Sequence, residues 1–282
     1  MKLCSISVDN NQRIGVKTEG GIVDITALGF PARMNDIIEG GEDILKRITD
    51  AMQSTALPQL CEESVKFLPV TEPMKVICAG LNYVDHAKET GASIPDHPVL
   101  FNKFSDSLSA HREPVVLPAW LSHYDYEAEL VVVIGKHVYN VDPKDAELSV
   151  FGYTCGNDLS ARKAQSLSSQ WLAGKAIPGF GPVGPYIVTA DGFNPCGSNG
   201  VYCDVNGVRE QSGNTLDMIF TCSDLLATAS RFFPLYPGDI IFTGTPHGVI
   251  AGKKPEDRVW LKPGDVVSIT IDGIGTLTTP LV

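Results

Sequence analysis

Short runs of alternating or continuous apolar residues predict strands over most of the chain. In the first part, three such runs between Gly- and Asn-containing turns predict a β-meander at residues 4–8, 13–18 and 21–25. Apolar residues at helical spacing then predict a helical segment between about Met34 and Met52, interrupted at Gly40-Gly41. A looser, Pro-containing stretch follows. We therefore expect a small N-terminal domain at residues 1–72 and a larger domain at residues 73–282.

Strand-like runs also outnumber helical ones after residue 72, and Gly and Pro punctuate them densely. The expected strands are 75–78, 130–134, 185–189, 200–205, 239–243 and 266–271. The expected helices are 83–90, 159–167 and a segment around 215–230. This pattern predicts a mainly β fold of the α+β class with short helices.

Composition narrows the classes of protein to consider. The chain has 282 residues, 43% hydrophobic and 20% charged, and no apolar run approaches the ~20 residues that cross a bilayer. Its first residues turn polar too early for a secretory signal, which predicts a cytoplasmic location. A net charge of −11 disfavours binding to nucleic acid. The seven scattered cysteines form no Cys-x-x-Cys pair and predict reduced, apolar packing residues.

Three carboxylates around an apolar strand form the main candidate site. Glu127 and Glu129 lie two apart, so on a strand their side chains point to the same side. Asp158 follows in Gly156-Asn157-Asp158. Because unpaired buried acids repel one another and lose hydration, a hard divalent cation is the simplest compensation, and we predict a Mg²⁺ or Mn²⁺ site. The alternative for Asp158 is an N-cap of the following helix.

A possible base lies in the segment Gly80–Glu89. On a short helix, His86 and Glu89 are three residues apart and can meet on one face. A carboxylate fixes the imidazole tautomer and stabilises its protonated form, which makes the histidine a better base. The alternative is a solvated helix face.

Polar groups in two further segments could hold an anionic ligand. Arg162 and Gln165 share a helix face with the helix start after Asp158. The Thr245 hydroxyl and backbone donors of the Gly-rich turn after strand 239–243 could bind a carboxylate, although such a turn has other uses.

In chain order, these segments resemble the fumarylacetoacetate hydrolase family. The resemblance runs from about Val76 to the C-terminus and rests on five motifs whose order is specific, although each alone is common. They are Asn82-Tyr83 with His86 and Glu89, Glu127-x-Glu129, Gly156-Asn157-Asp158 with Arg162 and Gln165, Gly174-Lys175 leading to Gly181–Pro185, and Thr243-Gly244-Thr245-Pro246 with Gly248-Val249.

The resemblance implies a mixed β-roll with short peripheral helices, a small N-terminal α+β domain, and a homodimer. It implies Mg²⁺ or Mn²⁺ held by Glu127, Glu129 and Asp158. A small-molecule 2-oxo acid would be bound by four further side chains. Two side chains on a lid over the substrate would activate water. The first four are Arg162, Gln165, Lys175 and Thr245, and the lid pair is His86 and Glu89.

These expectations lead to a hypothesis of hydrolytic carbon–carbon cleavage in a 2,4-dioxo acid, either an acylpyruvate or a dioxo sugar acid. The metal and Lys175 would stabilise a pyruvate enolate, while His86 deprotonates the attacking water. Oxaloacetate decarboxylation and oxo-acid isomerisation use the same enolate and stay open. A non-catalytic module that binds 2-oxo acids or a protein partner also stays open.

Two local features bear on the substrate. Relatives commonly follow the lysine with Ser-Phe-Asp, whereas Lys175 is followed here by Ala176-Ile177-Pro178, which leaves the substrate open. Trp171 could line the pocket, but we expect it to pack in the core.

Overall fold

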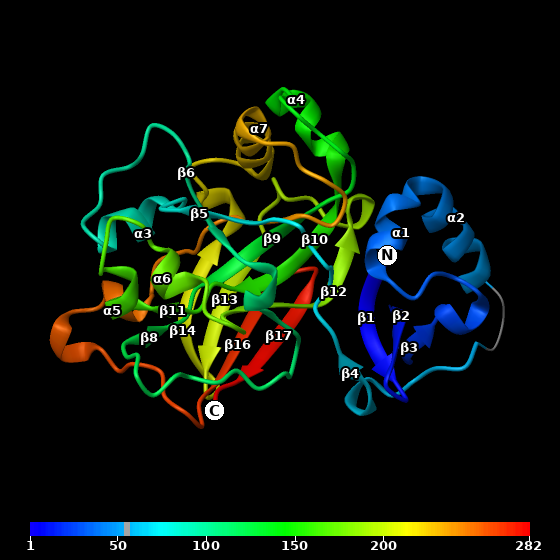
Figure 1. Cartoon of the computed structure of the whole chain (residues 1–282), viewed down its shortest axis with the longest axis horizontal. Coiled ribbons are helices and arrows are strands. Elements are labelled where there is room, and N and C mark those ends of the chain that lie inside the picture. Colours follow the sequence, from blue (N-terminus) through cyan, green and yellow to red (C-terminus); the bar gives the residue numbers. More distant parts are fainter. Residues whose placement is uncertain (54–56) are drawn as a thin grey trace.

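The computed structural model describes residues 1–53 and 57–282 and is mainly β, as predicted (Figure 1). Its largest sheet has 11 strands in the order β3-β2-β1-β12-β10-β9-β15-β5-β6, with β4 paired to β1 and β7 to β12. A four-stranded sheet, β14-β13-β16-β17, and a two-stranded sheet, β11-β8, complete the β structure of the described residues.

The strands of the large sheet are β1 (Lys2–Val8), β2 (Asn11–Thr18), β3 (Gly21–Asp24), β4 (Lys66–Phe67), β5 (Val76–Gly80), β6 (Val99–Lys103), β7 (Leu108–Ser109), β9 (Ala128–Ile134), β10 (Val150–Asn157), β12 (Gly181–Thr189) and β15 (Ile240–Phe242). The small sheets contain β8 (Tyr124–Asp125), β11 (Ser160–Ala161), β13 (Gly200–Val205), β14 (Val208–Asn214), β16 (Val266–Ile271) and β17 (Gly275–Pro280). The helices are α1 (Met34–Glu39), α2 (Gly41–Met52), α3 (Val84–Glu89), α4 (Pro143–Ala146), α5 (Arg162–Gln165), α6 (Leu172–Lys175) and α7 (Cys222–Phe232).

Strand β9 is central to the fold because both of its faces are buried. Leu130, Val132 and Ile134 pack into one hydrophobic core, and Val131 and Val133 pack into another. This explains the continuous apolar run at residues 130–134. Each such side chain contributes roughly 1.5–3 kcal/mol relative to exposure. The strand is therefore a rigid support for the carboxylates at its start.

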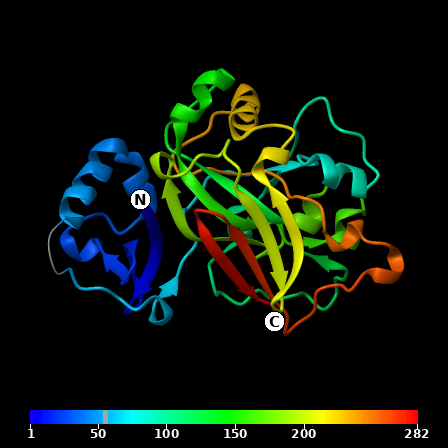
Figure 2. The same ribbon diagram turned by 180° about the vertical axis from the view of Figure 1, so that it is seen from behind.

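The N-terminal segment extends the large sheet. Strand β1 pairs antiparallel with β12, with Leu3 opposite Ile187, and α1 and α2 lie beside these strands at one end of the molecule (Figures 1 and 2). The predicted break at Gly40-Gly41 separates the two helices. The division into domains at residues 1–72 and 73–282 stays a prediction.

Two predicted helices differ from the structure. The segment 159–167 forms β11 and then the four-residue helix α5, because Ser160 and Ala161 pair with β8. The helix expected around 215–230 begins only at Cys222, where Thr221 caps it through the Asp224 N–H. Within residues 1–53 and 57–282, no helix is long and apolar enough to cross a membrane.

Candidate active site

Neighbouring strands bring the three predicted carboxylates together. Gly156 at the end of β10 lies opposite Glu129 at the start of β9, so Asp158, directly after β10, lies beside that pair. The Asp158 N–H donates to the Glu127 carbonyl at 3.0 Å. Glu127, Glu129 and Asp158 are all buried, and each offers an oxygen within 4.8 Å of the others.

The structure contradicts the alternative in which Asp158 is an N-cap. Helix α5 begins at Arg162 with Ala161 in the capping position and without a side-chain cap. The Asp158 carboxylate instead lies 2.7 Å from Lys175 Nζ through Oδ2 and 2.7 Å from Lys103 Nζ through Oδ1. The approach of Lys103 is an ion pair without hydrogen-bond geometry, so Oδ1 keeps a lone pair without a hydrogen-bond donor.

The donor set fits a hard divalent cation. Three carboxylates supply only oxygen ligands, which Mg²⁺ and Mn²⁺ prefer. The Lys175 ammonium already lies 2.7 Å from both Glu127 Oε2 and Asp158 Oδ2, so positive charge is stabilised at this point of the molecule. Glu129 forms no ion pair with a cation of the described residues, and its Oε2 accepts a hydrogen bond from the Gly244 N–H at 2.8 Å.

The surroundings separate the pKa values of the two glutamates. For Glu129, burial and the charges of Asp158 and Glu127 raise the pKa well above its ordinary value. For Glu127, burial alone would raise the pKa, but Lys175 and Arg162 outweigh it and lower the pKa to about 2. In the metal-free chain, Glu129 therefore keeps its proton to higher pH than Glu127 does.

A pH dependence of metal binding follows. Because the pKa of Glu129 is raised, the folded metal-free chain holds a proton that the unfolded chain releases above the ordinary value of 4.5. The free energy of unfolding without metal therefore falls as the pH rises above that value, and a cation must displace the proton. We expect Mn²⁺ affinity to increase as the pH rises above 4.5, and protons to be released on binding over the range in which Glu129 is still protonated. Calorimetry in buffers of different ionisation enthalpy measures this release, and zero release would contradict the assignment.

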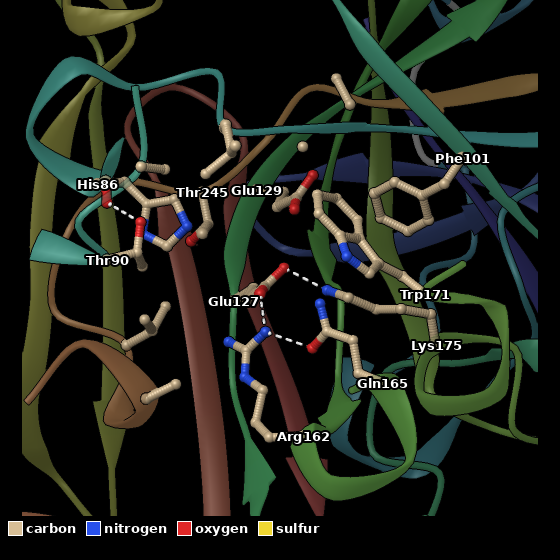
Figure 3. Close-up of a pocket in the computed structure, with 16 residues that line it drawn as sticks. His86, Thr90, Phe101, Glu127, Glu129, Arg162, Gln165, Trp171, Lys175 and Thr245 are labelled. Carbon is tan, nitrogen blue, oxygen red and sulfur yellow. Dashed lines mark hydrogen bonds and ion pairs between the residues drawn. The ribbon is translucent and has the colours of Figure 1, made fainter. Parts of the chain in front are cut away.

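The cavity beside the carboxylates has a volume of about 260 Å³ (Figure 3). It brings together most of the predicted ligand-binding and catalytic side chains. Those lining it are His86, Glu127, Glu129, Arg162, Gln165, Lys175 and Thr245. Asp158 lies behind Lys175 and is fully buried.

The predicted pair on α3 is formed. His86 Nδ1 lies 2.8 Å from Glu89 Oε1, and the other oxygen of Glu89 accepts from the Gly248 N–H at 2.9 Å. His86 is only 7% exposed, so the alternative of a solvated helix face is wrong. Figure 3 shows its ring across the cavity from Trp171 and Lys175. The carboxylate holds the imidazole in place and leaves the other ring nitrogen for a ligand.

Arg162 is held by a carboxylate that the sequence analysis missed. Its Nε donates to Asp125 Oδ2 at 2.8 Å, and Nη1 lies 2.7 Å from Glu127 Oε1 and donates to Gln165 at 3.0 Å. Asp125 is fully buried. Its position two residues before Glu127 extends the same period of two, a signal that could have revealed it.

Lys103 was also missed. It ends β6, is 2% exposed, and donates to the carbonyl oxygens of Phe180 at 3.0 Å, Leu159 and Lys175. These contacts tie Asp158 and Lys175 to the sheet. A single lysine after an apolar strand carries no local sign of such a role.

Trp171 differs from expectation. It is half-buried and lines the cavity, with its ring edge-on to Phe101 at 5.3 Å between centroids. A Cβ on Gly80 would lie 2.3 Å from the indole, so glycine is needed there for the ring to fit. The unusual Ala176-Ile177-Pro178 segment is not part of the cavity lining, and Ile177 packs into the hydrophobic core.

Comparisons with known proteins identify the family of the chain. The family model for the C-terminal region of fumarylacetoacetate (FAA) hydrolase matches residues 75–282. The oxaloacetate tautomerase fahd2 of Xenopus laevis is 40% identical over 96% of this chain and 86% of its own length. Human oxaloacetate tautomerase FAHD2A is 41% identical over 93% of this chain and 84% of its own length. Both are named as mitochondrial, and the cytoplasmic location expected here stays a prediction.

Solved structures show the same fold. Fumarylacetoacetate hydrolase from Exiguobacterium antarcticum has a TM-score of 0.88 and 36% identity, covering 100% of this chain and 99% of that chain. Maleylpyruvate hydrolase from Sphingobium sp. SYK-6, solved with manganese(II) and pyruvate, has a TM-score of 0.83 and 32% identity with the same coverage. The predicted fold class is thus confirmed. This chain belongs to the fumarylacetoacetate hydrolase family.

Proposed function

We propose that the protein is a divalent-metal-dependent enzyme that interconverts the keto and enol forms of oxaloacetate. The observation that carries this proposal is the cavity of about 260 Å³ itself, because Glu127 and Glu129 of the carboxylate trio and His86 of the His86–Glu89 pair all line it. That volume suits a four-carbon acid. Relatives at 40–41% identity over 93–96% of the chain are named oxaloacetate tautomerases, which supports this substrate.

The chemistry is proton transfer next to a ketone. A divalent cation held by Glu127, Glu129 and Asp158 would polarise the 2-oxo group and favour its enolate. His86 would remove a proton from C3 of the keto form and pass it to the oxygen on C2 to give the enol, and in the reverse direction it would move this proton from the oxygen back to C3, with Glu89 stabilising the protonated imidazole in between. The Lys175 ammonium supplies positive charge beside the carboxylates, where the enolate oxygen develops negative charge.

The substrate carboxylates need donors. Gln165 and Thr245 line the cavity and can donate to them, and the Arg162 guanidinium adds positive charge. Because Arg162 is already paired with Asp125 and Glu127, it mainly orients Gln165 and lowers the local negative potential.

Hydrolysis of acylpyruvates is the second candidate. The His86–Glu89 pair, at 2.8 Å and buried, could equally deprotonate a water that attacks C4 of a 2,4-dioxo acid. Bond cleavage would then release a pyruvate enolate, stabilised as above. A maleylpyruvate hydrolase of the same fold, solved with manganese(II) and pyruvate, supports this alternative. Oxaloacetate decarboxylation requires the same enolate but no attacking water.

The test is a substrate panel on the magnesium-loaded protein. We expect faster decay of the ultraviolet absorbance of enol-oxaloacetate than in buffer, and loss of this acceleration with EDTA. Pyruvate release from acetylpyruvate would instead support the hydrolase, and release from oxaloacetate the decarboxylase. Absent or chelator-insensitive turnover across the panel would favour a non-catalytic binding module. Light scattering on the same sample tests the predicted homodimer, which should have twice the chain mass.

A further inference from the structure

Gln211 joins the metal-binding strand to the substrate-binding turn. It belongs to β14 of the four-stranded sheet and is 1% exposed. Its Oε1 accepts from the N–H of Ala128, the residue between Glu127 and Glu129, at 2.9 Å. Its Nε2 donates to Thr245 Oγ1 at 2.9 Å. One buried amide thus contacts both sides of the candidate active site.

The Ala128 N–H determines which way this amide points. A backbone N–H can only donate, so it requires the amide oxygen of Gln211 opposite it. The NH₂ group must then face the turn after β15, where it also donates to the Pro246 carbonyl at 2.8 Å. A flipped amide would place donor against donor at Ala128 and acceptor against acceptor at Pro246. The observed orientation is therefore strongly preferred.

This orientation decides whether the Thr245 hydroxyl donates or accepts in its hydrogen bond with Gln211. An amide NH₂ cannot accept, so Thr245 must accept in that bond, and its own proton is left to point elsewhere. Among the described residues the structure shows no acceptor for that proton. Thr245 is 3% exposed and lines the cavity, on the same side as His86 in Figure 3. The proton is thus available to a ligand in the cavity.

We propose that Gln211 is a positioning residue that makes the Thr245 hydroxyl a hydrogen-bond donor to a substrate carboxylate. An ionised carboxylate has only acceptor atoms, so it is recognised better by a hydroxyl that accepts from the Gln211 NH₂ group and keeps its proton to donate than by one that lacks this partner. The inference deepens the proposed function and rests on it for the substrate class. It predicts an effect on anion binding that is separate from proton transfer at His86.

The test uses malate, a stable four-carbon dicarboxylate, as the probe in calorimetry on the manganese-loaded protein. Gln211→Met retains the side-chain length but removes the amide. We expect it to weaken malate binding about tenfold and to raise KM by a similar factor with kcat within about twofold. Thr245→Val should show the same loss, and the double variant should be no weaker than Thr245→Val alone, because both changes remove one interaction. Thr245→Ser, which keeps the hydroxyl, should bind like wild type.

A control separates positioning from general destabilisation. Thr215 follows β14 directly, is buried, and donates to the Gly197 carbonyl at 2.7 Å. Thr215→Val should lower the melting temperature without changing malate affinity. Multiplicative losses in the double variant, or a parallel loss of Mn²⁺ affinity in Gln211→Met, would overturn the inference. If Gln211→Met does not fold, unchanged malate affinity in Thr245→Val overturns it. Failure of wild type to bind malate would instead overturn the proposed substrate class, and this inference with it.

Discussion

Replacing Glu127 with Gln should reduce turnover by about a thousandfold or more and weaken Mn²⁺ binding by at least about a hundredfold. The change removes an ionised ligand whose pKa is held at about 2 by Lys175 and Arg162. It also leaves these two buried cations without a carboxylate that lies 2.7 Å from each. Calorimetric titration with Mn²⁺ and initial rates at saturating metal measure the two effects.

The matched control is another buried carboxylate. Asp239 is fully buried and accepts from the Lys75 and Tyr236 N–H groups, outside the cavity lining. Asp239→Asn should lower stability but leave Mn²⁺ affinity unchanged. Equal metal affinity in Glu127→Gln and wild type would refute the role of Glu127 as a ligand.

Replacing His86 with Gln should lower kcat by about a hundredfold to ten-thousandfold, the range expected for loss of a general base. Metal affinity should stay within about threefold of wild type, because His86 Nδ1 pairs with Glu89 and is not among the carboxylate ligands. Steady-state rates combined with Mn²⁺ calorimetry separate the two readouts.

His137 offers the comparison for this variant. It is exposed and packs against the Tyr236 ring at a tilt, outside the cavity lining. His137→Gln should retain wild-type rates. Undiminished turnover in His86→Gln would mean that another residue is the base. It would also contradict the proposed role of Glu89, which is to stabilise the protonated imidazole.

Local patterns predicted the fold where burial dictates the sequence. Residues 130–134 of β9 are buried on both faces of the strand, and this favours an apolar residue at each of these five positions. The prediction failed where tertiary pairing overrides propensity. Ser160 and Ala161 follow a helical pattern but pair with Asp125 and Tyr124, so the helix there starts later and is short.

The site was predictable where residues of one segment act together. Glu127 and Glu129 share a strand face and His86 and Glu89 a helix turn, so spacing alone placed each pair. Bringing Asp158 to them depends on the register of β10 against β9, which no local pattern encodes. The grouping of Asp158 with the two glutamates was a hypothesis from the sequence, and the family resemblance supported it.

The residues that the sequence analysis missed contact the site from distant positions in the chain. Lys103 contacts Asp158 from 55 residues away in the chain, and Gln211 contacts Ala128 from 83 residues away. A lone lysine or glutamine in a strand has no partner nearby in the sequence, and only the folded sheets reveal what it holds. Such buried polar residues must be hydrogen-bonded, which makes them informative once the structure is known.

The central claim is that Glu127, Glu129 and Asp158 bind one divalent cation. The most direct measurement is anomalous diffraction from a crystal of the protein soaked in Mn²⁺. We expect a single strong peak in contact with all three carboxylates, with Lys175 Nζ displaced from its place between Glu127 and Asp158. Suppose instead that the protein proves metal-dependent and the crystal shows a fully occupied manganese ion at another position, with no peak among these three side chains. That result would contradict their role as the metal ligands.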